Sequence, residues 1–189
     1  MRSIVVRDCS GVLRQDNLLP GQCISVDHFV CSTKGRLFTS RGKTSALERL
    51  YCGGCLFVDH ASGYVHVEHQ TSMSSHDTMR AKEGFELLCR DYGILPQKYM
   101  TDNATAFTSR NFTDHLKVFR QVNSFAGAGA HHHNGHAERC IRTIMSIART
   151  MMLHSAIHWP DLADTTLWPI AVTHAIFLWN QLDNWLKFV

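Results

Sequence analysis

Three carboxylates stand in parts of this 189-residue chain where their surroundings suit catalysis. Asp27 interrupts the apolar run 24–30, Asp102 precedes Asn103, and Glu138 lies in the segment 131–139. Carboxylate oxygens are ligands that Mg²⁺ prefers, and a pair of such ions stabilises both the attacking and the leaving oxygen of a phosphodiester displacement. The three residues therefore predict a site for paired divalent metals that acts on phosphodiesters.

The spacing of these carboxylates is not specific by itself. The chain has 16 Asp and Glu residues. Roughly one acidic pair at the separation of Asp102 and Glu138 is therefore expected by chance. The surroundings of each carboxylate must carry the interpretation.

Asp27 and Asp102 are both expected on strands. We expect Asp27 within a central strand, where a buried carboxylate needs a partner; a salt-bridged core Asp is the alternative. Asp102 is expected at the end of a strand, which is where ligands bind in an open α/β sheet. An Asp that caps a helix or shapes a turn is the alternative at this position.

Glu138 is expected in the first turns of a helix, on the border between its two faces. The apolar face holds Ile141, Ile144, Met145, Ala148 and Met152. The polar face holds Arg139, Arg142, Ser146 and Arg149. The positive end of a helix favours a carboxylate, although a surface Glu paired with Arg142 is the alternative.

The composition is that of an ordinary globular domain. A hydrophobic fraction of 44%, a charged fraction of 19% and a net charge of +3 permit a nucleic-acid partner without requiring one. Seven Cys residues in no regular pattern indicate a reducing, intracellular compartment. No apolar run approaches the roughly 20 residues that span a bilayer, so we expect no membrane partner.

The apolar periodicity and the turn signals predict an α/β domain, in which a mixed five-stranded sheet is flanked by helices. We expect a linker over residues 1–21, a core over 22–182 and an atypical tail over 183–189. The expected strands are 22–31, 52–59, 64–70, 98–101 and 121–125. The expected helices are 74–92, 109–119, 134–155 and 159–182. The small residues of 126–130 predict a flexible loop.

Four blocks of the sequence carry a family resemblance: residues 24–27, 57–63, 101–103 and 131–139. Over roughly residues 20–182 the chain resembles the catalytic core of copia-type retrotransposon integrases, which belong to the retroviral integrase superfamily and have an RNase H-like fold. The resemblance implies that Asp27, Asp102 and Glu138 form a DDE motif that binds two Mg²⁺ or Mn²⁺ ions. It further implies 3′-end processing and strand transfer during DNA integration.

The same resemblance implies partners and a location. The partners would be the DNA ends of the element, the target DNA and further copies of the chain, in the nucleus or in a retrotransposon particle. Trp168, Phe177 and Trp179 are expected in the core or at a subunit interface. No His-His-Cys-Cys order precedes residue 22, and 183–189 does not resemble the family's continuation, so we expect a truncated copy of the element.

Polar and basic residues around the site are expected to contact nucleic acid. Asn103 adjoins Asp102, while His133 and Asn134 lie on the loop before the helix of Glu138. The basic candidates are Arg139, Arg142 and Arg149 on that helix and Lys34, Arg36, Arg41 and Lys43 in the segment 32–50. A solvated surface is the alternative for this segment.

Two other functions stay open at this point. One is an RNase H-like nuclease that cuts nucleic acid without joining it. The other is a catalytically silent relic that binds nucleic acid or a partner through the same fold.

Overall fold

The computed structural model describes residues 18–39, 50–125 and 135–186, and their side chains as far as residue 181. Some predictions lie outside the described residues. These are most of the linker, Arg41, Lys43, the loop 126–130, His133, Asn134 and the last three residues of the tail.

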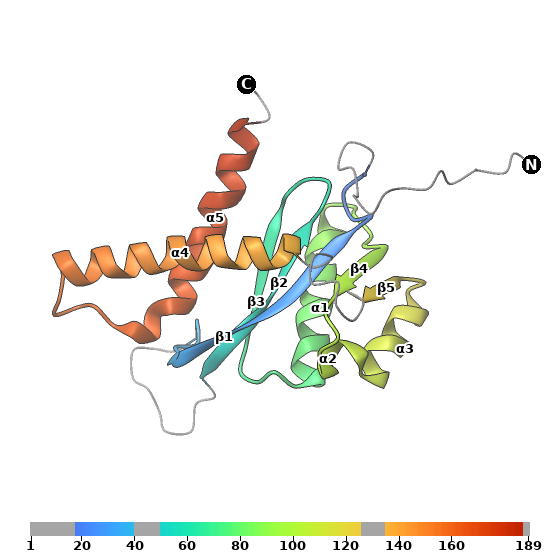
Figure 1. Ribbon diagram of the computed structural model, residues 1–189, viewed down its shortest axis with the longest axis horizontal. Helices are drawn as coiled ribbons and strands as arrows, with labels where there is room; N and C mark the ends of the chain where they lie inside the picture. Colours follow the sequence, from blue (N-terminus) through green and yellow to red (C-terminus); the bar gives the residue numbers. More distant parts are fainter. Residues whose placement is uncertain (1–17, 40–49, 126–134, 187–189) are drawn as a thin grey trace, which may run out of the picture.

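A mixed sheet of five strands forms the centre of the molecule, in the order β3-β2-β1-β4-β5 (Figure 1). The antiparallel part consists of β1 (Ile24–Gly35), β2 (Tyr51–Asp59) and β3 (Val65–Gln70). The parallel part adds β4 (Lys98–Thr101) beside β1 and β5 (Val122–Phe125) beside β4. The predicted fold class is thus confirmed, and β1 is the central strand that Asp27 was expected to occupy.

Helices cover both faces of this sheet (Figure 1). One face is covered by α1 (Ser75–Asp91), α2 (Thr105–Thr108) and α3 (Arg110–Val118). The other is covered by α4 (Gly135–His158) and α5 (Trp168–Leu186). No helix in the described part of the chain is both long and apolar enough to cross a membrane.

The alternation of side chains along β1 and β2 divides the core into two clusters. Ile24, Val26 and Phe57 point to α1, α2 and α3. Phe29 and Leu56 point to α4 and α5. Odd-numbered positions of β1 therefore face α4, which sets the direction of the Asp27 side chain.

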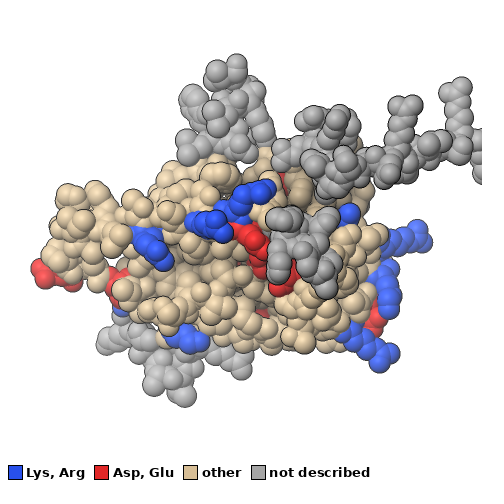
Figure 2. Space-filling model, viewed as in Figure 1, with Lys and Arg blue, Asp and Glu red and all other residues tan. Residues whose placement is uncertain are grey.

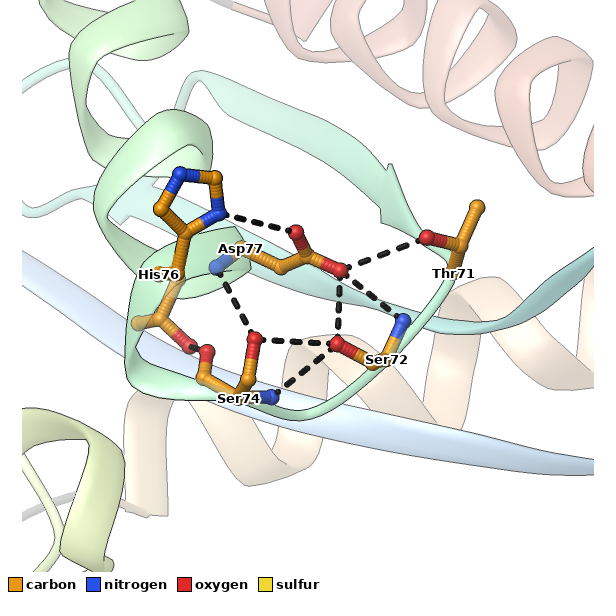
Figure 3. Close-up of polar contacts among 6 residues, drawn as sticks. Thr71, Ser72, Ser74, His76 and Asp77 are labelled. Carbon is orange, nitrogen blue, oxygen red and sulfur yellow. Dashed lines mark hydrogen bonds and ion pairs between the residues drawn. The ribbon is translucent and has the colours of Figure 1, made fainter. Parts of the chain in front are cut away.

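The start of α1 is held by a polar cap that joins it to the end of β3 (Figure 3). Ser74 Oγ accepts a hydrogen bond from the Asp77 backbone N–H at 3.2 Å. In return, Asp77 Oδ2 accepts from Ser72 N at 3.0 Å and Ser72 Oγ at 2.7 Å. The first of these bonds satisfies one backbone N–H of the first turn, and the others tie the cap to the chain before it, which explains why the helix begins where the sequence predicted.

Several predicted boundaries are wrong. α4 ends at His158 instead of about 155, and α5 ends at Leu186 instead of about 182. β1 continues to Gly35 instead of ending near residue 31, with an irregular register after Val30. The last helix begins at Trp168, not at Trp159.

The sequence Trp-Pro occurs at both 159–160 and 168–169, and either proline is tolerated in a first helical turn. The second is used because the chain first makes a short 3₁₀ helix, η2 (Thr165–Leu167), which Asp164 caps by accepting from Thr166 N at 2.8 Å.

Candidate active site

Asp27 lies in the middle of β1 and faces α4, opposite Leu56 of β2. Its side chain is half-buried, and its Oδ1 accepts a hydrogen bond from the His28 backbone N–H at 2.8 Å. Burial, and then the negative charges of Asp102 and Glu138, raise the pKa of Asp27 to about 6. No ion pair of the described residues includes Asp27, so the alternative of a salt-bridged core Asp is not observed.

Asp102 directly follows β4. β4 runs parallel to β1 with Ser25 opposite Met100, and two more residues along each strand bring Asp27 and Asp102 level with each other. Asp102 Oδ1 accepts from the Ala104 backbone N–H at 3.1 Å. The carboxylate therefore also shapes the turn that leads into α2, as the alternative interpretation proposed.

Glu138 lies in the first turn of α4 and is exposed. Its charge reaches Asp27, because it contributes to the raised pKa of that residue. Among the described ion pairs, none joins Glu138 to Arg142. The charges of Asp102 and Glu138 thus both act on Asp27.

The oxygen donors of Asp27, Asp102 and Glu138 are of the kind that divalent cations prefer. Within the described residues, no three His, Cys, Asp or Glu side chains already stand close enough together to hold one ion. The charge repulsion that adds to the effect of burial on the pKa of Asp27 acts over several ångström, whereas Mg²⁺ ligands sit at about 2 Å from the ion. Charges can therefore interact at distances at which their side chains do not yet share an ion. In addition, Mg²⁺ commonly keeps several waters and uses only one or two carboxylates, so it does not require three protein ligands in contact. A cation between Asp27 and Asp102 would offset the repulsion between them.

The structure spreads the expected nucleic-acid contacts over two regions. Arg139, Arg142 and Arg149 are all exposed on α4. Figure 2 shows positive side chains along this helix and acidic side chains near its N-terminal end. Asn103 is exposed beside Asp102 and has a partner within the structure.

The other region is the far end of β1. Lys34 is exposed there, but Arg36 forms an ion pair with Asp164, with 2.6 Å between Nη2 and Oδ2. Arg36 thus fastens the end of β1 to η2, a structural role that the sequence did not reveal.

Three side chains that contact one another near β1 and the start of α4 were missing from the predicted site. Ser25, His60 and His136 lie on the α4 face, where Ser25 Oγ and His60 Nε2 share a hydrogen bond of 2.7 Å. The His60 ring stacks on that of His136 with 4.7 Å between centroids. Burial, and then the neighbouring His136, lower the pKa of His60 to about 4. The only sequence signal was their presence in or beside the blocks 24–27, 57–63 and 131–139.

His28 lies on the opposite face of β1 and contacts the helices on that side of the sheet. Its Nε2 and Thr78 Oγ1 are 3.1 Å apart, and its ring stacks on Phe107 at 4.6 Å. These contacts hold α1 and α2 against β1. They fix the turn at Asp102 with respect to Asp27.

Comparisons with known proteins show the fold of this chain. The sequence matches no protein-family model and no curated protein. The HTLV-2 integrase catalytic core domain in complex with magnesium, in a dimeric form, has a TM-score of 0.57 and 21% identity over 85% of this chain and 86% of that chain. Its trimeric form has the same TM-score and identity over 85% of each chain.

A larger assembly is also similar. The simian T-cell lymphotropic virus intasome in complex with PP2A regulatory subunit B56 gamma has a TM-score of 0.55 and 19% identity, over 82% of this chain and 48% of that chain. At these identities the likeness establishes the fold: an RNase H-like sheet of the kind found in integrase catalytic cores.

Proposed function

We propose that this chain is the catalytic core of a DDE-type integrase and acts on DNA by metal-dependent phosphoryl transfer. One observation carries the proposal: burial, and then the negative charges of Asp102 and Glu138, raise the pKa of Asp27 to about 6, on the fold of integrase cores. Such a concentration of unpaired negative charge is costly unless a cation offsets it.

The three carboxylates would hold two Mg²⁺ or Mn²⁺ ions. When bound, the ions supply activation of a water or a DNA 3′-hydroxyl and stabilisation of the leaving 3′-oxygen. The similar HTLV-2 core is described in complex with magnesium, which supports this choice of ion.

The chain itself contributes position and charge. Asp27 is held on the most central strand, Asp102 by its own turn, and Glu138 by the packing of α4. Asp27 must lose its proton to bind a cation. At neutral pH it does so, because even its raised pKa of about 6 lies below 7.

DNA would approach along α4 and past Asn103. Arg139, Arg142 and Arg149 offer exposed guanidinium groups that suit backbone phosphates, and Lys34 extends the positive surface. Arg36 is a weaker candidate because Asp164 already pairs with it. On the basis of the sequence alone, the proposed DNA contacts also include Arg41, Lys43, His133 and Asn134.

Two wider features also belong to the proposal. The first is the origin and location: a copia-type retrotransposon, acting in the nucleus or in a retrotransposon particle, with 22–182 as the core. The second is a homo-oligomer, which the dimeric and trimeric forms of the HTLV-2 core support. On α5, Trp168 is buried, Trp179 packs partly against the core and Phe177 is 56% exposed, which suits a subunit interface around Phe177.

The test is a paired assay of wild-type protein and Glu138→Gln on a labelled DNA duplex with Mg²⁺ or Mn²⁺, scored for nicked and joined products. We expect both products from wild type and neither from the variant. Nicks without joining would instead establish a nuclease. No metal-dependent product from a folded wild-type chain would leave nucleic-acid binding as its function.

A further inference from the structure

The stacked imidazole rings of His60 and His136 connect the sheet to the start of α4, two residues before Glu138. Their planes meet at 29°, with 4.7 Å between ring centroids. The contact joins the residue that follows β2 to the first turn of α4.

His60 is a rigid support for this contact. It is 7% exposed, shares the 2.7 Å hydrogen bond with Ser25, and its backbone N–H donates to Cys23 O at 2.9 Å. Ser25 is fully buried and stands two residues before Asp27 on the same side of β1. The ring of His60 is thereby fixed to the strand that carries Asp27.

α4, by contrast, packs on the core through a strip of buried residues that is flanked by partly buried ones such as Ile141 and Met145. The buried residues of this strip are small or slender: Ala137, Cys140, Ile144 and Ala148. At about 100° per residue, His136 and Glu138 lie on opposite sides of that strip, one before and one after Ala137. A rotation of α4 about its axis that lifts His136 from the sheet would move Glu138 in the opposite sense.

We infer that the stack of His136 on His60 sets the rotation of α4 about its axis and so places the Glu138 carboxylate relative to Asp27. The inference rests on the proposed function for its consequence, metal binding, but not for the contact itself. His136 is a positioning residue, since it acts only through Glu138.

The test compares His136→Ala, which removes the ring, with His136→Phe, which keeps an aromatic face for His60. His154→Ala is the matched control, because His154 stacks on His158 at 4.2 Å in the exposed last turns of the same helix. Two quantities are measured in each folded protein: amide hydrogen exchange of residues 139–142 without metal, and the affinity for Mn²⁺.

We expect His136→Ala to exchange these amides about tenfold faster, because a local contact is lost. Its Mn²⁺ affinity should fall by about 10-fold or more, as it does when a group that orients a metal ligand is removed. His136→Phe and His154→Ala should match wild type in both measurements.

Two results would overturn the inference: unchanged exchange in His136→Ala, or a His136→Phe variant as impaired as His136→Ala. A failure of the proposed function would give a result that can be distinguished from these two. Wild type would then bind no Mn²⁺, while the exchange data would still show whether the ring stack holds α4.

Discussion

The acidic side chains on the two faces of the sheet have opposite surroundings: Glu86 is buried beside a cation, and Asp27 is half-buried near two further negative charges. Under α1, Glu86 Oε1 accepts from Lys82 Nζ at 2.6 Å and from Tyr99 OH at 2.7 Å. Burial alone would raise the pKa of Glu86, yet the Lys82 ammonium holds it below its usual value. Under α4, burial, and then the negative charges of Asp102 and Glu138, raise the pKa of Asp27 to about 6.

The contrast between these two sets of acidic residues indicates different roles for them. Lys82 is 1% exposed and Glu86 is 6% exposed, and each satisfies the other within α1. The Tyr99 hydroxyl of β4 also donates to Glu86, so this group fastens α1 to the sheet. Asp27 and Asp102 each accept one backbone hydrogen bond, but no ion pair of the described residues includes Asp27, Asp102 or Glu138. A protein keeps such a costly arrangement where a ligand completes it.

The largest expected effect follows from neutralising Asp27 on the α4 face of the sheet. Asp27→Asn should reduce metal-dependent cleavage and joining of DNA to background, because a neutral amide is a poor ligand for Mg²⁺. The same change should not lower the free energy of unfolding, since it removes a repulsive charge. A thermal melt beside the DNA assay checks both parts, and a variant that keeps its activity would refute the first.

Neutralising Lys82 on the α1 face should instead lower the stability of the fold. Lys82→Met should lower the free energy of unfolding by about 3–5 kcal/mol, because Glu86 would stay buried without its cation. Urea unfolding measures this loss. The double variant Lys82→Met/Glu86→Gln is the control and should lose less. Equal losses in both proteins would show that Glu86 carries no buried charge.

The raised pKa of Asp27 predicts a pH dependence specific to the α4 face. The ordinary pKa of an Asp carboxyl is 3.8, and Asp27 has a pKa of about 6 in the folded chain. Between these pH values the folded state binds more protons than the unfolded state, so Asp27 lowers the free energy of unfolding as the pH rises from about 4 to 6. Asp27→Asn should lack this contribution. Urea unfolding of both proteins across that range shows it as a difference that grows with pH, and parallel curves would contradict it.

The smallest effects are expected from the arginines of α4. Arg142→Ala or Arg149→Ala should weaken DNA binding modestly and reduce its salt dependence by about one counterion each, because each is proposed to contact one phosphate. Arg110→Ala on α3, an exposed arginine on the opposite face, is the control. Fluorescence anisotropy over a range of salt concentrations measures the slopes. An equal effect of Arg110→Ala would argue against binding along α4.

The sequence predicted the sheet and the place of each carboxylate because local patterns determine them. The apolar run around Asp27 indicated a buried central strand, and the short strand before Asp102 ended where expected. Helix boundaries that depend on caps were also predictable where the cap is local, as for Ser74 and α1.

The remaining features depend on contacts between distant segments. Nothing near Trp159 shows that the helix starts only at Trp168, because the choice depends on η2 and on the ion pair of its cap with Arg36. The same holds for His60 and His136, which are 76 residues apart in the sequence and meet only when α4 lies on the sheet. Arg36 was predicted to contact DNA because its ion pair with Asp164, a residue far away in the sequence, could not be foreseen.

The measurement that tests the central claim most directly is an anomalous diffraction map of crystals soaked in Mn²⁺ at neutral pH. The account predicts manganese at Asp27 and Asp102, with Glu138 drawn towards it. A map with no peak at these carboxylates, in crystals that bind Mn²⁺ elsewhere or not at all, would contradict the claim that they form a metal site.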